Sequence, residues 1–454
     1  MRPSTIMNQF LPNFIKRKID PGFHKILTNI SWLLAERIFH MILSLLIGIW
    51  FIRYLGPTRY GIYSYATAIV TLLLPLSKMG MPQVVVRNLV EDVYNKHKIL
   101  GTAFTLEVVG GILVIPLALT LSFLLRPDES KILVFVGIIS IGEVFRSFDV
   151  IELWFSSQVE SKYSAIVNSC SFLTATLVKV SLIISQSSLL MFVLLAPAEV
   201  AITSCLLIAV YFVKVGSVKE WEFDLAYGKN LLRDSWPLIF SGFVIVIYMR
   251  SDQIMIARMI DDESVGIYSA AVNLSKVWYF LPMSIINSIT PSIMALRQEG
   301  ELRKYYKRLS ELSGSVVLLT YIIAIPITIL SGRIVNFLYG SDYILSGMIL
   351  SLHIWTGCFV ALGLVRNIYL VSESLTYISL VSTAIGAAMN LVFNYFLIRQ
   401  SGIFGAAIAT LFTQAFAAYI SSALFKQTRD IFWIQSKALM LVNIPGMLRG
   451  SSKA

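Results

Sequence analysis

The chain has 454 residues, of which 56% are hydrophobic and only 14% charged, and its formal net charge is +11. A soluble domain averages about 25% charged residues, and a soluble fold of this length could not hide so many apolar side chains in a core. The composition excludes a soluble globular protein and predicts an all-α integral membrane protein. Basic loops that face anionic lipid headgroups account for the net charge, so no nucleic-acid partner is expected.

The N-terminal segment, residues 1–26, is rich in Lys and Arg and has no short apolar core followed by a cleavage site. We therefore expect a cytoplasmic tail and not a signal peptide. After it, apolar stretches of the roughly 20 residues that a bilayer requires follow one another to residue 425. Twelve spans are predicted, with centres near Met41, Val70, Leu113, Ile139, Ala175, Ala201, Val246, Trp278, Ile323, Thr356, Ala388 and Phe412.

The Lys and Arg residues are unevenly distributed between the two ends of these spans. With the N-terminus inside, 24 of the 37 lie on the cytoplasmic side and seven on the opposite side. The positive-inside rule then predicts two cytoplasmic termini in a multi-pass protein of the cell (inner) membrane. The loops are too short for a catalytic domain, and no phosphate-binding or metal-binding motif is present, so we expect no enzyme activity, cofactor or metal.

The two halves of the chain are similar to each other. Gly61–Ser64, with the sequence Gly-Ile-Tyr-Ser, recurs as Gly266–Ser269, and Ile115-Pro116 recurs as Ile325-Pro326. Each half holds six spans, an even number, which predicts a parallel repeat of two pseudo-symmetric six-helix bundles around a central cavity. The predicted segments are the first bundle 27–213, a cytoplasmic linker 214–230, the second bundle 231–425 and a cytoplasmic tail 426–454.

Several charged residues lie inside the predicted spans. Each costs about 2.5–3.5 kcal/mol in a membrane and normally faces a cavity or a partner. Lys179 and Lys276 have no acidic residue within one turn of their own helix. Arg250 is two residues from Asp252, so the side chains of Arg250 and Asp252 point to nearly opposite sides of their helix. These three basic residues therefore need a partner on another helix or an anionic ligand.

Other polar residues in the spans allow two interpretations. Neighbouring opposite charges, Glu36 with Arg37 and Glu143 with Arg146, are consistent both with buried pairs and with a cavity wall. In the eleventh span a polar stripe follows one helix face, which serves either close helix packing or cavity lining. The stripe consists of Ser379, Thr383, Gly386, Asn390 and Asn394.

Four segments carry a family resemblance. Leu55–Pro57 with Tyr60–Ala66, and Arg250–Ala257 followed by Val265–Ser269, resemble the polysaccharide transporter (Wzx-type) family of the multidrug/oligosaccharidyl-lipid/polysaccharide exporter superfamily. The resemblance extends from about Leu27 to Phe425. It implies a flippase that moves a polyprenyl-diphosphate-linked oligosaccharide from the cytoplasmic to the outer leaflet, for surface polysaccharides such as O-antigen, capsule or exopolysaccharide.

The resemblance also implies a cationic cavity between the bundles. This cavity would bind the lipid-linked oligosaccharide, and membrane lipids would surround the protein. Acidic residues lie within the spans as well, and they are candidates for coupling to a proton or a sodium ion. The candidate substrate-binding residues are Arg37, Arg146, Lys179, Arg250, Lys276 and Arg366, and the candidate ion-coupling residues are Glu36, Glu143 and Asp252.

Two alternatives remain open at this stage. A multidrug or organic-cation antiporter of the same superfamily would have an acid-dominated cavity, and the mixture of acidic and basic residues in the spans does not decide between the two. A membrane polymerase or ligase of lipid-linked glycans would typically carry a large outward loop, whereas the outward loops here are short.

Overall fold

The computed structural model describes the backbone of residues 21–442 and the side chains of residues 39–442. This part of the chain contains helices and turns and no strand. Together with short 3-10 and π turns it consists of α3 (Pro21–Leu72), α4 (Leu74–Ser77), α5 (Met81–Glu91), α6 (Lys96–Leu125), α7 (Ser130–Phe145), α8 (Val150–Ser157), α9 (Lys162–Ile184), α10 (Leu189–Lys214), α11 (Leu225–Met259), α12 (Asp262–Lys276), α13 (Phe280–Gln298), α14 (Leu302–Tyr339), α15 (Ile344–His353), α16 (Thr356–Ser372), α17 (Thr376–Ala415), α18 (Ser421–Leu424) and α19 (Arg429–Leu439).

The prediction of an all-α membrane protein with about twelve spans is confirmed. Within the described residues, nine helical segments are long and apolar enough to cross a membrane. The first of them, Phe39–Glu91, holds predicted spans one and two, and the last, Thr376–Leu424, holds spans eleven and twelve. The fourth span is α7 and α8 with a 3-10 turn, Arg146–Asp149, between them. This turn lies where charged residues interrupt the apolar sequence.

In each of these two segments, a glycine between the two spans makes the chain turn back. Gly56 has φ +72° and Gly402 has φ +59°, in the left-handed region that only glycine adopts without strain. After Gly56 the chain returns toward itself, and the ring of Tyr63 lies 5.4 Å from that of Phe51. After Gly402 the return is so close that a Cβ atom on Gly405 would overlap the carbonyl oxygen of Leu397. Each turn joins two spans in place of a loop.

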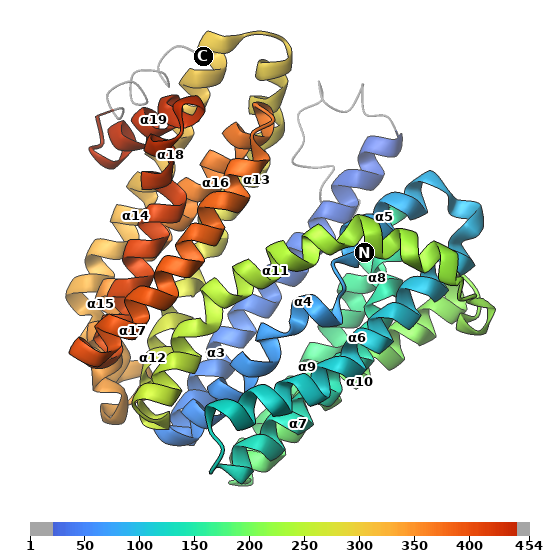
Figure 1. Cartoon of the computed structure of the whole chain (residues 1–454), viewed down its shortest axis with the longest axis horizontal. Helices are drawn as coiled ribbons and strands as arrows, with labels where there is room; N and C mark the ends of the chain where they lie inside the picture. The colour runs from blue at the N-terminus through green and yellow to red at the C-terminus, as the bar shows by residue number, and fades with distance from the viewer. Residues whose placement is uncertain (1–20, 443–454) are drawn as a thin grey trace, which may run out of the picture.

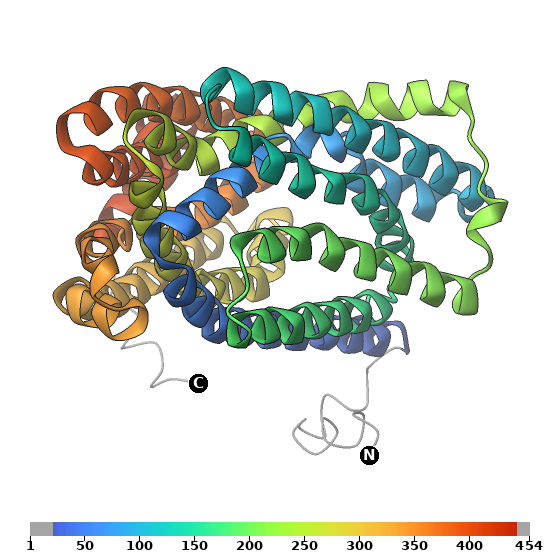
Figure 2. The ribbon, with the colours of Figure 1, turned by 90° about the horizontal axis from the view of Figure 1, so that it is seen from below.

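The helices form two arms that meet at one end and diverge at the other. In Figure 1 the first arm contains α3 to α10 and the second contains α12 to α19, and Figure 2 shows the arms side by side. Large apolar side chains such as Ile329 and Phe337 are 75% and 81% exposed on the outside. Lipid is the solvent that such a surface requires.

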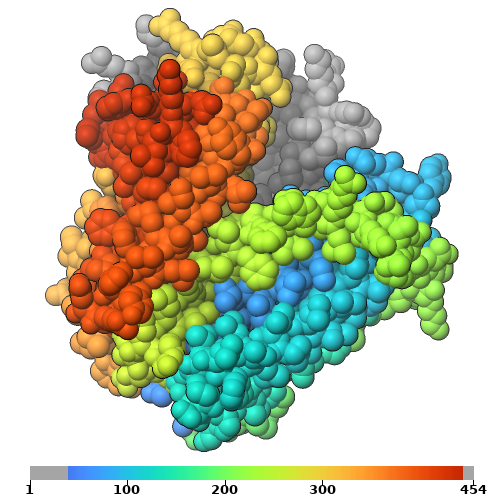
Figure 3. Space-filling view, viewed as in Figure 1, coloured from blue at the N-terminus to red at the C-terminus, as the bar shows by residue number. Residues whose placement is uncertain are grey.

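Helix α11 passes from one arm to the other, and Figure 3 shows its surface between the two. Near its start it packs against the first arm, where a Cβ atom on Gly80 would lie 2.6 Å from the carbonyl oxygen of Ser235. Near its end it packs against the second arm, where the Ser251 hydroxyl donates to Asn390 Oδ1 over 2.8 Å. Any rocking of one arm against the other must therefore bend or shift α11.

The two arms are in closest contact at the end where Gly56 and Gly402 lie, which we call the closed end. Here the repeated glycines of the two halves cross: a Cβ atom on Gly61 would overlap the Asp262 carbonyl oxygen, and one on Gly266 would overlap the Pro57 carbonyl oxygen. The Arg126 guanidinium also binds the Asp262 carboxylate across the two arms, at 2.5 and 3.2 Å. Glycine at both positions lets the backbones touch.

We predict that Gly61→Ala destabilises this closed end, because the added methyl group has no space without a backbone shift. Such overpacking costs about 1–3 kcal/mol. The thermal midpoint of the purified protein in detergent measures the loss. Gly332→Ala is the matched control, since its Cβ would meet no atom within 4 Å. Equal thermal midpoints for the two variants would contradict the close backbone contact at Gly61.

Candidate functional site

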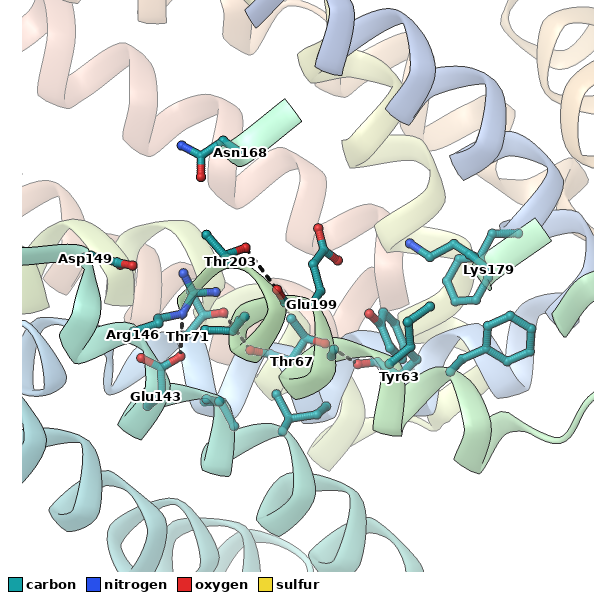
Figure 4. A pocket seen from close by; sticks show the side chains of 18 of the residues that line it. Tyr63, Thr67, Thr71, Glu143, Arg146, Asp149, Asn168, Lys179, Glu199 and Thr203 are labelled. Carbon is teal, nitrogen blue, oxygen red and sulfur yellow. Dashed lines mark hydrogen bonds and ion pairs between the residues drawn. The ribbon is translucent and has the colours of Figure 1, made fainter. Parts of the chain in front are cut away.

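Three cavities lie in a row across the two arms. The first, of about 460 Å³, is inside the first arm and is shown in Figure 4. The middle cavity, of about 450 Å³, lies between the arms, and the third, of about 570 Å³, is inside the second arm. Lys179 lines both the first and the middle cavity, and Lys276 lines both the middle and the third. Lys179, from the first half of the chain, therefore lies between the first and the middle cavity, and Lys276, from the second half, lies between the middle and the third.

The first and third cavities occupy corresponding places in the duplicated halves. The described lining of the first comes from predicted spans one, two, four, five and six. That of the third comes from spans seven, eight, ten, eleven and twelve. No described lining residue of either cavity belongs to α6 or α14, which hold spans three and nine. The repeat in the sequence is thus also a repeat of cavity walls.

The charges of the three cavities differ. Among described residues, the first is lined by four carboxylates and two basic groups, and the third by one carboxylate, Asp252, and two basic groups, Lys276 and Arg366. The two lysines are the only charged residues in the described lining of the middle cavity. The charged residues of the first are Glu143, Arg146, Asp149, Glu152, Lys179 and Glu199.

Lys179 and Lys276 form no ion pair within residues 39–442, whose side chains the structure describes. Among described residues, no carboxylate lies within 4 Å of either ammonium group. Lys179, on α9, lies over the ring of Phe51 at 5.3 Å. Lys276 is the last residue of α12, where the negative end of the helix dipole favours a cation. An anion that enters the middle cavity would meet both groups.

Arg366 lies in the wall of the third cavity and is only 4% exposed. Its guanidinium donates to the Ala417 carbonyl oxygen at 2.7 Å and to the Ser382 hydroxyl at 2.9 Å. Its Nε has no hydrogen-bond partner within the described part of the chain. This arginine is held in place by neutral groups and keeps its charge available to the cavity.

Arg250 behaves differently from the other basic candidates. It lines none of the three cavities described here, and its guanidinium donates to Gln253 Oε1 on its own helix over 3.3 Å. Nearby Asp252 is buried and accepts hydrogen bonds from the Tyr268 hydroxyl and from the backbone N–H of Gln253. Its carboxylate is therefore held by neutral donors.

Arg146 and Glu143 form the ion pair that the sequence allowed, and both line the first cavity, but they belong to a larger network of charges that sequence reasoning did not identify. The Arg146 Nε donates to Glu143 Oε1 at 3.1 Å. Lys78, which follows α4, donates to Glu107 Oε2 at 3.1 Å, to Asp149 Oδ2 at 2.8 Å and to the Arg146 carbonyl oxygen at 2.7 Å. The sequence places Lys78 in a loop between spans, and no local pattern indicates that it folds back onto α6 and the 3-10 turn.

Two candidates lie outside the described side chains, and the polar stripe divides between its two interpretations. The side chains of Glu36 and Arg37 precede residue 39, so their roles stay predictions. In α17, Ser379 and Thr383 line the third cavity. Deeper in the same helix, Asn390 and Asn394 are fully buried, and Asn390 donates to the Thr413 hydroxyl over 3.2 Å. Two of the five stripe residues therefore line a cavity, and two others are buried between helices.

Comparisons with known proteins point to one group. A family model described as "Polysaccharide biosynthesis protein" matches residues 26–297. A probable flippase, AglR of Haloferax volcanii, is 28% identical over 183 residues, which are 38% of this chain and 37% of that protein. The match thus spans little more than a third of this relative.

Two solved structures are similar over nearly their whole length. An inward-facing multidrug resistance MATE family transporter of the MOP superfamily has a TM-score of 0.71 at 13% identity, over 89% of this chain and 96% of its own. The lipid II flippase MurJ in an inward closed conformation has a TM-score of 0.65 at 15% identity, over 92% of this chain and 93% of its own. At such identities these matches show a shared fold.

We predict that Lys78→Met destabilises the first arm strongly, because it leaves the buried Glu107 carboxylate without its cation. Breaking one partner of a buried ion pair costs about 3–5 kcal/mol. Arg87→Met is the control, since its ion pair with Asp234 is about half exposed and should contribute less than about 1 kcal/mol.

Denaturant unfolding in detergent measures both losses. Adding Glu107→Gln to Lys78→Met should restore part of the stability, because the orphaned charge is removed. A Lys78 variant that unfolds like the Arg87 variant would show that the network is not structural.

Proposed function

Because the chain belongs to the polysaccharide biosynthesis protein family, we propose that it is a flippase, which moves a polyprenyl-diphosphate-linked oligosaccharide from the cytoplasmic to the outer leaflet for a surface polysaccharide. The observation that carries the proposal is the middle cavity, where Lys179 and Lys276 are the charged groups of the described lining. An ammonium group is a point charge suited to a phosphate. One lysine from each half gives a diphosphate contacts with both arms.

The physical barrier to flipping fits this arrangement. Each hydroxyl moved into hydrocarbon without a partner costs about 4–8 kcal/mol, so a glycan does not cross a bilayer unaided. The cavities inside the arms offer polar walls, such as Thr67 and Thr203 in the first and Asn367 and Gln414 in the third. The lipid tail remains in the bilayer.

The direction of transport follows from the orientation. The Lys and Arg distribution supports two cytoplasmic termini in the cell membrane, and with this orientation the diverging ends of the arms would face the cytoplasm and the closed end the outside. A substrate made in the cytoplasm would enter from the open side. Rocking of the arms, with release of the Arg126–Asp262 contact, would then expose it to the outer leaflet.

One observation favours a second candidate, the organic-cation antiporter. Four carboxylates line the first cavity against two basic groups, a lining that attracts cations. Three of these four, however, already bind Arg146, Lys78 or Asn168. The named relatives are transporters and flippases, which supports a transporter over a polymerase or ligase.

We predict that a cell without this protein accumulates lipid-linked oligosaccharide on the cytoplasmic face and loses the corresponding surface polysaccharide. Lipid extracts and surface staining measure the two effects. If the surface glycan stays intact and the cells become sensitive to lipophilic cations, the flippase proposal is wrong and the organic-cation antiporter is supported.

We also predict that Lys179→Gln and Lys276→Gln each impair export, whereas the corresponding Arg variants retain more of it, because Arg keeps the charge. Loss of one charge-assisted contact costs about 1.5–3 kcal/mol, which is roughly 10- to 100-fold in affinity. Surface glycan in the deletion strain complemented by each variant is the readout. Lys131→Gln, an exposed lysine outside the cavities, is the control. Normal export by both Gln variants would exclude the two lysines as substrate contacts.

A further inference from the structure

Glu199 is the one acidic group of the first cavity whose carboxylate has no hydrogen bond or ion pair among the described residues. Glu143 accepts from Arg146, Asp149 from Lys78 and Glu152 from Asn168. Only the backbone carbonyl of Glu199 is bonded, by the hydroxyls of Ser171 and Thr203. The helix is therefore fixed at this residue while its carboxylate faces the cavity.

Lys179 is the basic group of the same cavity that has no ion pair with any acid in the described part of the chain. Figure 4 shows Glu199 and Lys179 extending into one space from α10 and α9. These helices are tied together at Ser171, whose hydroxyl is 2.6 Å from that of Thr203. The two charges interact electrostatically but lie more than 4 Å apart. A small movement of the flexible lysine stem would bring them together.

The other groups around Glu199 do not offer it a free cation. Arg146 also attracts it, but that guanidinium is already bound to Glu143. The titratable and charged groups that face Glu199 from the neighbouring elements are Tyr63, Glu143, Arg146, Asp149, Glu152 and Lys179. Of the two cations in this set, Lys179 is the one without an ion pair, and it also borders the middle cavity.

An unpaired ammonium group is unfavourable in a transporter that must change conformation without bound substrate in order to return to its starting state. While the arms are closed around the cavity, an isolated charge in a low-dielectric interior costs several kcal/mol. In the loaded protein the diphosphate neutralises Lys179. In the empty protein another anion must do so.

We propose that Glu199 is the resident counter-anion of Lys179: it pairs with this lysine when the site is empty, and the diphosphate of the substrate displaces it. The inference rests on the flippase function proposed above and assigns Glu199 a role as a competitor for the substrate. Binding and release then exchange one anion for another at the same ammonium group.

Binding of farnesyl diphosphate to the purified full-length protein in detergent tests this exchange, with farnesol as the probe without phosphate. Glu199→Gln should bind farnesyl diphosphate about tenfold more tightly than wild type, because one competing charge interaction is removed. Glu91→Gln removes an exposed carboxylate outside the cavities and should leave the affinity unchanged. In a Lys179→Gln background the effect of Glu199→Gln should disappear.

The pH dependence gives a second readout that a structural role would not produce. As pH falls, protonation of Glu199 removes the competitor in wild type only. The wild-type Kd divided by the Glu199→Gln Kd should therefore approach one at low pH and rise toward neutral pH. This ratio cancels the titration of the probe itself.

The experiment distinguishes a failure of the counter-anion proposal from a failure of the flippase proposal. If Glu199→Gln binds like wild type at all pH values while Lys179→Gln weakens binding, the counter-anion is wrong and the flippase proposal stands. If neither wild type nor Glu199→Gln prefers farnesyl diphosphate over farnesol, diphosphate recognition fails and the counter-anion with it. Thermal midpoints of all variants confirm that they are folded.

Discussion

The rule that a charge inside a membrane needs a partner or a cavity governs the arrangement of this protein. The chain satisfies it in three ways. Lys78 and Arg146 are bound to carboxylates in a network inside the first arm. Arg366 is held by a carbonyl and a hydroxyl and faces the third cavity. Lys179 and Lys276 face the middle cavity, and no described acidic residue is in contact with either ammonium group, so these two are the candidates to bind an anionic ligand.

The sequence predicts the fold well because its signals are local. Span length, loop charge and the repeated segment Gly61–Ser64 predict twelve spans and a duplication, and the structure places Gly61 and Gly266 at the crossing of the two halves. The site is harder to predict, because it depends on contacts between helices. Lys78 looks like a loop residue, yet it reaches α6, and Arg250 looks like a cavity residue, yet it bonds to its own helix. The packing of the helices against one another, which decides both, is not encoded in a local pattern.

The two halves of the chain hold cavities with corresponding walls and different charges. Their walls come from corresponding spans, but the first holds an excess of carboxylates and the third an excess of basic groups. Between them the middle cavity takes one lysine from each half. A diphosphate at this boundary would leave its glycan room in a neighbouring cavity, and the basic third cavity suits a glycan that carries acidic groups.

The charge balance of the cycle follows from the pairing of Lys179 with Glu199. If the empty protein returns with this lysine neutralised by its own carboxylate, no external anion has to be carried back with it, and the net charge moved in each cycle is that of the substrate. With a cell interior that is negative, each negative charge moved outward gains about 2.3 kcal/mol per 100 mV. Export of a diphosphate-linked lipid is then favoured by the membrane potential itself, and the charge balance requires no coupling proton or sodium ion. The other acidic candidates fit this view, because Glu143 is engaged by Arg146, and Asp252 by Tyr268 and a backbone N–H.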